Sequence, residues 1–249
     1  MPQVRHWLRI PATMFAAAIL IGLVAAHTSL VQPDEFHLER VLQTDLRTGW
    51  LTTVMLDVSD VVSPVGGLLV LAAGTAWLLF VRRRPVDAVA TFLVVAVGWN
   101  AAQLGKFIVA RHRPPVMYSL APETGSDSFP SGHVCFTVSA ALALYFLARG
   151  TRHQRAVTWL GCAAVVLVAF SRLYIGAHYP TDVAGSVLIS FAAVVLLTGV
   201  WHRWLLPRLD RVPLLARFGP LPGTGGTARP AGDEAKPFTA PRSAHRLSD

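Results

Sequence analysis

Six long apolar runs constrain this chain more than any other feature. They cover residues 11–31, 64–81, 86–109, 131–148, 156–173 and 182–204. Each is close to the ~20 residues that an α-helix needs to cross a hydrocarbon core about 30 Å thick. Only 14% of the 249 residues are charged and 53% are hydrophobic, whereas roughly 25% are charged in a soluble domain. The sequence therefore predicts an all-α, polytopic membrane protein with a six-helix bundle.

The basic residues of the loops gather on one side of such a bundle. They are Arg5, Arg9, Arg82, Arg83, Arg84, Arg149, Arg152, Arg155, Arg203, Arg208, Arg211 and Arg217. Because short cytoplasmic loops carry an excess of Lys and Arg, we expect both termini to be cytoplasmic in a multi-pass cell-membrane protein. The first run has the basic start of a signal peptide, but its length favours an uncleaved anchor. Lys106, Arg111 and Arg113 fall on the other side, where a phosphate ligand would explain them.

Two segments outside the runs differ from them in composition: one is amphipathic, and the other is a polar, basic tail. Between residues 36 and 58, apolar residues recur every four positions, which predicts an extracytoplasmic amphipathic helix that lies on the membrane surface or packs on the bundle. These residues are Leu38, Leu42, Leu46, Trp50, Val54 and Val58. The basic tail, 207–249, is poor in large apolar residues from Gly219 onward, so we expect it to be disordered and cytoplasmic. The predicted domains are a membrane domain, 1–206 (motif core 60–204), and this tail.

Three polar segments lie at the ends of apolar runs. KFIVARHRP begins at Lys106, Ser131-Gly132-His133 opens the fourth run, and SRLYIGAHYPTD ends at Asp182. Together they supply fixed cations, two imidazoles and a carboxylate, which are groups that stabilise and carry out phosphoryl transfer. This set of groups predicts a phosphoryl-transfer site at one membrane edge.

The local pattern suggests how these groups act. The first N–H groups of a helix lack intrahelical partners and bind anions, and Gly132 lets a phosphate approach the backbone while Ser131 adds a hydroxyl. His133 is then placed to donate a proton to a departing oxygen. Asp182 follows His178 by four residues. Such a carboxylate can hold one imidazole tautomer and leave the other nitrogen as a nucleophile.

The three segments together resemble the signature of the type 2 phosphatidic acid phosphatase family. The first segment has Lys and, after six residues, Arg-Pro; the second has Pro-Ser-Gly-His; the third has Ser-Arg, then His after five residues and Asp after three more. The matching residues are Lys106, Arg113, Pro114, Pro130, Ser131, Gly132, His133, Ser171, Arg172, His178 and Asp182. The resemblance covers residues 60–200. It implies a six-helix core, a site on the extracytoplasmic face, and a reaction through a phosphohistidine that uses no metal or other cofactor.

The family mechanism, carried onto this chain, makes His178 the nucleophile, Asp182 its orienting carboxylate and His133 the proton donor. The residues that would hold the phosphate oxygens are Lys106, Arg113, Ser131, Gly132 and Arg172. We therefore expect a lipid phosphatase whose partners are the bilayer and a membrane lipid phosphate. The resemblance suggests several lipid substrates, of which we rank a polyprenyl diphosphate first, ahead of phosphatidylglycerol phosphate, phosphatidic acid and diacylglycerol pyrophosphate.

Two other classes of protein stay open at this point. One is a non-catalytic lipid-phosphate-binding protein or transporter, which would be expected to place charged residues within its spans. The other is a vanadate-dependent haloperoxidase-like enzyme, against which the membrane runs argue. No nucleic-acid-binding motif accompanies the basic residues.

The remaining polar residues receive structural interpretations. We expect Arg111 to be an exposed charge, Asp127 and Glu123 to be solvated loop residues, and Asn100 and Gln103 to hydrogen-bond a neighbouring helix. Cys135 and Cys162 lie within apolar runs and receive no function. The histidines outside the motifs are expected to be structural or solvated: His6, His27, His37, His112, His153, His202 and His245.

Overall fold

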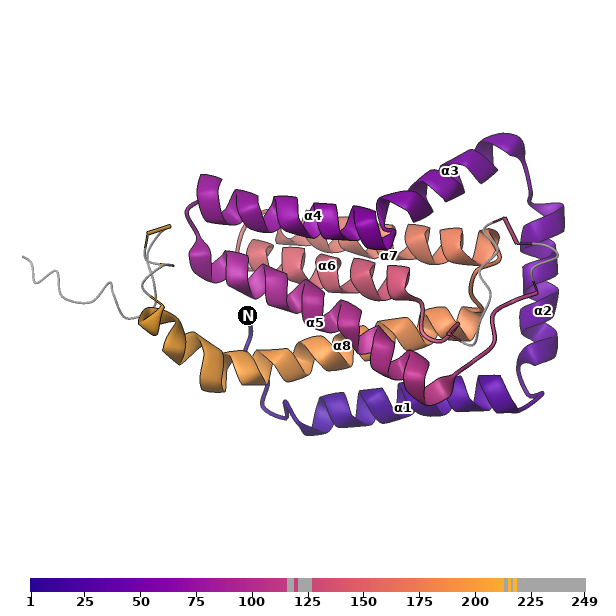
Figure 1. The fold of residues 1–249 in the computed structure, drawn as a ribbon, viewed down its shortest axis with the longest axis horizontal. Helices are drawn as coiled ribbons and strands as arrows, with labels where there is room; N and C mark the ends of the chain where they lie inside the picture. The colour runs from indigo at the N-terminus through magenta and orange to yellow at the C-terminus, as the bar shows by residue number, and fades with distance from the viewer. Residues whose placement is uncertain (116–118, 121–126, 213–214, 216, 219–249) are drawn as a thin grey trace, which may run out of the picture.

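The structure, a computed structural model, describes residues 1–115, 119–120, 127–212, 215 and 217–218. Every regular element within those residues is helical (Figure 1). The α-helices are α1 (Arg9–His27), α2 (Gln32–Arg40), α3 (Gly49–Val61), α4 (Pro64–Ala76), α5 (Pro85–Val109), α6 (Gly132–Ala148), α7 (Gln154–Tyr174) and α8 (Pro180–Val200). Three of them continue into π-helical turns, η1 (Val41–Asp45), η2 (Trp77–Val81) and η4 (Trp201–Leu205), and η4 leads into the 3₁₀ turn η5 (Leu206–Arg211).

Five helices in the described part of the chain are long and apolar enough to cross a membrane. They are α1, α4 with η2, α5, α7, and α8 with its extension. The sixth predicted span is the shorter helix α6, whose 17 residues extend about 25 Å. The predicted all-α membrane fold is confirmed, with five helices of spanning length and one shorter apolar helix among the described residues.

Helix α6 lies at the centre of the bundle, where it packs against α5, α7 and α8. Helix α5 approaches α6 closely at Gly98, where an added Cβ would collide with Ser139 of α6. The polar Ser139 hydroxyl is satisfied within α6, since it donates to the Cys135 carbonyl at 2.7 Å. The start of α6, which carries one of the polar segments, is therefore held on several sides.

The Phe129 ring fixes the segment that leads into α6. This ring is fully buried and is clamped by glycines on two other helices. A Cβ at Gly22 of α1 would lie 2.8 Å from the ring, and one at Gly185 of α8 would overlap it. Both helices thus accept the ring only because these positions lack a side chain. The packing joins α1 and α8 to the residues immediately before Ser131.

The prediction of a single helix over residues 36–58 is wrong. Helix α2 and its π-helical turn end at Asp45, and α3 begins at Gly49. The break is stabilised by Tyr174 of α7, whose hydroxyl accepts the Thr48 N–H at 3.3 Å and lies 2.9 Å from Thr52 Oγ1. A four-residue periodicity cannot reveal a partner so distant in the sequence.

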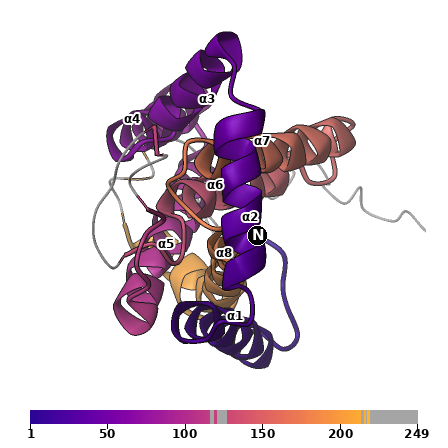
Figure 2. The same ribbon diagram turned by 90° about the vertical axis from the view of Figure 1, so that its right-hand side faces the viewer.

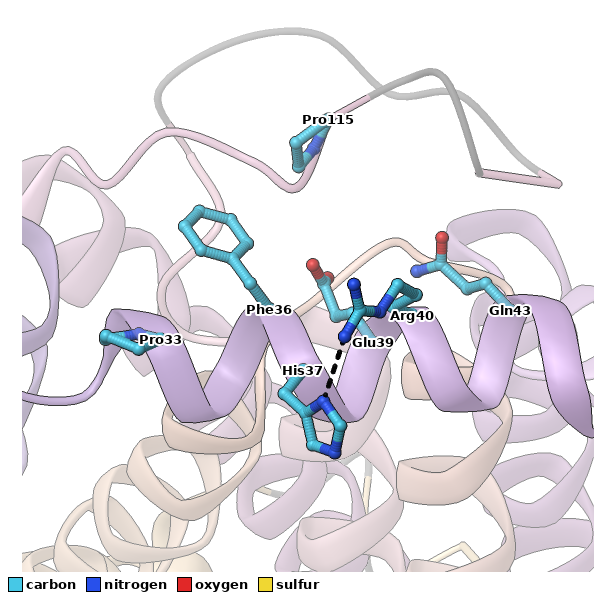
Figure 3. A pocket seen from close by; sticks show the side chains of 7 residues that line it. All are labelled: Pro33, Phe36, His37, Glu39, Arg40, Gln43 and Pro115. Carbon is cyan, nitrogen blue, oxygen red and sulfur yellow. Dashed lines mark hydrogen bonds between the residues drawn. The ribbon is translucent and has the colours of Figure 1, made fainter.

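Most of the apolar stripe of this region is exposed rather than packed. Leu38, Leu46, Trp50 and Val54 are exposed and Leu42 is buried, whereas the other buried residues of α2 and η1 are the polar Glu35, Glu39 and Gln43. Helix α2 crosses the end of the bundle (Figure 2). A cavity of about 340 Å³ lies beside it, and Figure 3 shows Glu39 and Gln43 on the side facing Pro115. The polar face of α2 therefore covers the bundle end.

The opposite end of the bundle gathers the beginning of the chain and the end of α8. Trp7 and Trp204 meet edge to face with centroids 6.0 Å apart, and His202 Nε2 lies 2.9 Å from the Met1 carbonyl oxygen. Predicted basic loop residues lie at this end, and the three polar segments lie at the end that α2 covers. This arrangement agrees with the sidedness expected from the loop charges, which stays a prediction.

Candidate active site

The three polar segments converge on a cavity of about 440 Å³. Its polar wall contains Lys106, Arg113, Asp127, Gly132, His133 and His178, and its other wall contains Val62, Pro64, Leu68, Trp99, Asn100 and Gln103. Ser131, Arg172 and Asp182 do not line the cavity and are buried beside those residues. Five of the eight predicted site residues therefore face one space, and the other three belong to the layer behind it.

The turn before α8 places His178 against Asp182. Pro180 occupies the first turn of α8, and Asp182 Oδ2 accepts the Tyr179 N–H at 2.9 Å and the Ser128 hydroxyl at 2.6 Å. The same oxygen lies 3.5 Å from His178 Nδ1, which is close enough for an electrostatic interaction but does not form a hydrogen bond in this structure. Burial lowers the pKa of His178 to about 4, although the neighbouring Asp182 carboxylate opposes the shift. The imidazole is therefore neutral near pH 7, as a nucleophile must be.

Two cations of the first segment meet at one carboxylate. Lys106 Nζ lies 2.9 Å from Asp127 Oδ2, and Arg113 Nε lies 2.9 Å from Asp127 Oδ1. Hydrogen bonds from Arg113 and Lys106 hold the pKa of Asp127 well below its usual range. Asp127 is a loop residue with half of its side chain exposed, as predicted, but the sequence did not reveal that both of its oxygens are paired with cations. The position of the carboxylate shows that both cations can bind one anionic group at the same time.

The start of α6 presents the second segment to the cavity. Ser131 is the N-cap residue, and its own N–H donates to Ser186 Oγ at 2.8 Å. Its hydroxyl is buried and has no hydrogen-bond partner among the described residues. A Cβ at Gly132 would be 3.8 Å from Trp99 Nε1, which is ordinary contact. The fold therefore does not require a glycine at position 132, although the position faces the cavity.

Helix α3 supports the third segment where α7 ends. Arg172 is 2% exposed, and its Nη1 donates to Ser59 Oγ at 2.6 Å. The neighbouring Ser171 hydroxyl donates to the Met55 carbonyl at 2.7 Å. Ser59 was not identified from the sequence, because nothing in its own neighbourhood marks it as a partner of a residue on α7.

Arg111 is buried, so the prediction of an exposed charge is wrong. It is 4% exposed, its Nη1 donates to Asp182 Oδ1 at 2.7 Å, and its Nη2 donates to Glu35 of α2. Glu35 Oε1 also accepts the Thr181 hydroxyl at 2.6 Å. The guanidinium lies 4.0 Å from the centroid of the Tyr179 ring. A network thus runs from α2 through Arg111 to the carboxylate beside His178.

The amides of α5 do not behave as predicted. Asn100 Nδ2 donates to the Ala96 carbonyl of its own helix at 2.8 Å, so the expected bond to a neighbouring helix is wrong. Both Asn100 and Gln103 line the cavity. Of the two cysteines, Cys135 is buried and Cys162 is exposed. Glu123, His245 and the tail from Gly219 lie outside the described residues.

The chain resembles known proteins over this part of its length. A model of the PAP2 superfamily matches residues 85–205. Phosphatidylglycerophosphatase B of Bacillus subtilis is 27% identical over 202 residues, covering 76% of this chain and 93% of that protein. An undecaprenyl-diphosphatase of Sulfolobus acidocaldarius is 30% identical over 128 residues, covering 48% of this chain and 60% of that protein.

A solved structure has the same arrangement of helices. It is the crystal structure of a transmembrane PAP2-type phosphatidylglycerolphosphate phosphatase from Bacillus subtilis. It matches with a TM-score of 0.65 and 24% identity, covering 79% of this chain and 98% of that one. Residues 85–205 of this chain are therefore similar to the PAP2 superfamily, and the chain has the fold of that solved membrane phosphatase.

Proposed function

We propose that this protein is an integral membrane lipid phosphatase that works through a phosphohistidine and without a metal ion. The observation that carries the proposal is the position of His178. Its neutral, buried imidazole has Asp182 behind it and shares one cavity with His133, Lys106 and Arg113. This combination provides a nucleophile, a second imidazole and paired cations within reach of one phosphate.

The first step forms the covalent intermediate. With Nδ1 facing the Asp182 carboxylate, His178 Nε2 attacks phosphorus, and the bond between phosphorus and the lipid oxygen breaks. His133 gives its proton to that oxygen, so the lipid leaves as an alcohol, or as a monophosphate when the substrate is a diphosphate. A bound phosphate dianion beside His133 favours the protonated imidazole that this step requires.

The second step releases phosphate. His133, now neutral, takes a proton from water, and the resulting hydroxide attacks phosphorus as the bond to His178 Nε2 breaks. Inorganic phosphate leaves, and His178 is neutral again. Throughout both steps Lys106 and Arg113 in the cavity wall, and Arg172 in the layer behind it, balance the charge of the phosphate oxygens, with the Gly132 N–H and the buried Ser131 hydroxyl as further donors.

A membrane lipid is the substrate class that suits this setting. The cavity wall contains side chains of α4 and α5, which are both long and apolar enough to cross a membrane. A lipid can thus keep its chain among apolar side chains while its phosphate reaches His178. The relatives named above act on lipid phosphates and diphosphates according to their names.

The decisive experiment measures phosphate release from lipid phosphates by the detergent-purified protein in excess EDTA. We expect activity to survive chelation and to be lost in His178→Ala, and we expect acid quenching of the wild type to trap a labile phosphoryl group that this variant lacks. His202→Ala, which changes a histidine at the far end of the bundle, is the matched control. More than a tenth of wild-type turnover in His178→Ala would refute the covalent mechanism.

A further inference from the structure

Helix α5 carries three polar side chains on the face that lines the cavity. Lys106, Gln103 and Asn100 are spaced three residues apart, and all three contribute to the cavity wall. A rise of 1.5 Å per residue places Gln103 about 4.5 Å and Asn100 about 9 Å from Lys106 along the helix. The cavity therefore continues from the cations toward the middle of α5 past two neutral amides.

These amides have hydrogen-bonding groups to spare. Asn100 uses one N–H on the Ala96 carbonyl, which leaves its second N–H and its carbonyl oxygen. Gln103 makes no side-chain hydrogen bond with any residue that the structure describes, and both residues are exposed where they line the cavity, so a ligand can reach them. Polar side chains are unfavourable in a spanning helix unless they find partners. A ligand in the cavity would supply those partners.

The charges around the cavity limit what that ligand group can be. The cations of the wall, Lys106 and Arg113, lie together at Asp127, and apart from the two histidines the other described residues of the wall carry no positive charge. A second phosphate at this depth would be a desolvated anion without a cation. Neutral oxygen groups, such as hydroxyls and ester carbonyls, fit the amides better.

On the basis of the proposed phosphatase activity, we propose that Gln103 and Asn100 bind neutral oxygen substituents of the leaving alcohol. They would thereby select a phosphate carried on a glycerol unit. The second carbon of such a unit bears a hydroxyl or an acyl ester, on the order of 5 Å from phosphorus. A polyprenyl diphosphate presents a second phosphate there, followed only by hydrocarbon. This assignment reverses the order of substrates that the sequence alone suggested.

The test compares two phosphomonoesters in mixed micelles. One is a diacylglycerol phosphate, and the other is an alkyl phosphate of similar chain length, which lacks the glycerol oxygens; farnesyl diphosphate is the third substrate. The variants are Gln103→Met and Asn100→Leu. The matched control is Leu104→Met, which alters an exposed residue of α5 that does not line the cavity.

We expect each amide variant to lower kcat/KM for the diacylglycerol phosphate by about two- to tenfold, as for the loss of one neutral hydrogen bond. Hydrolysis of the alkyl phosphate should not change, and Leu104→Met should change neither. Equal losses on both monoesters, no loss on either, or wild-type preference for farnesyl diphosphate would overturn the assignment. Failure of the underlying phosphatase would differ, because the wild type would then hydrolyse none of the three substrates.

Discussion

Replacing Arg111 by Met should damage both stability and turnover, because the guanidinium lies between two buried carboxylates. Glu35 and Asp182 would keep their charges and lose the cation that bridges them. Removing one partner of a buried ion pair typically costs about 3–5 kcal/mol. In a chain of this size each kcal/mol lowers the unfolding midpoint by roughly 2–4 °C. We therefore expect a midpoint roughly 6–20 °C below that of the wild type in the same detergent.

The effect on turnover follows from what Asp182 retains. Its Oδ2 keeps the Ser128 hydroxyl and the Tyr179 N–H, so the carboxylate stays near His178 but loses a charged hydrogen bond at Oδ1. Such a bond contributes about 1.5–3 kcal/mol. We expect kcat to fall roughly 10- to 100-fold, with a smaller change in KM, since Arg111 does not line the cavity.

The assay pairs phosphate-release kinetics with thermal unfolding and includes two controls. Arg40→Met removes an exposed arginine from α2 and should change little. Adding Glu35→Gln to Arg111→Met removes one of the stranded charges and should recover part of the lost stability, with a coupling of about 1–3 kcal/mol. If Arg111→Met matched Arg40→Met in both midpoint and kcat, the network would have no role in the site.

Three further outcomes follow from the geometry. Because the pKa of His178 lies at about 4 and the nucleophile must be neutral, kcat/KM should stay high down to that pH and fall below it, rather than near 6.5, the ordinary pKa of a histidine; a pH–rate profile checks this. Gly132→Ala should keep the wild-type unfolding midpoint but lose activity, because its methyl group fits beside Trp99 yet stands where a phosphate would bind. Burial, with the charge of Glu35, raises the pKa of Glu39 to about 8, so the folded state holds a proton that the unfolded state releases near pH 4.5. Stability should therefore decline as the pH rises from about 4.5 to about 8 and then level off, and Glu39→Gln should flatten that decline in unfolding measured from pH 6 to 9.

The parts of the site that could be predicted are those encoded over short distances. His178 and Asp182 are four residues apart across a helix start, and Ser131-Gly132-His133 opens a helix. The arrangement of each segment therefore follows from residues that are close in the sequence. The apolar runs likewise predicted the helices of the bundle, since the length and composition of a spanning segment are local properties.

Asn100 aside, the incorrect or missed predictions concern residues whose partners are distant. Arg111 meets Glu35, 76 positions earlier, and Thr48 meets Tyr174, 126 positions later. Asp127 has its cationic partners 21 and 14 residues away on α5 and the segment after it. An isolated charge or an apolar repeat looks the same in sequence whether or not such a partner exists. Burial of the acidic face of α2 could therefore not be inferred from its periodicity.

The clamped ring of Phe129 has a consequence for exchanging parts between related proteins. Residues 85–205, which match the superfamily, contain Phe129 and Gly185 but not Gly22 of α1. A chimera that combined this stretch with another protein's first helix would bring a side chain against the ring wherever that helix lacked a glycine at this level. The residues just before Ser131 would then move, although every motif residue was retained. In evolutionary terms, α1 and the start of α6 are expected to vary together.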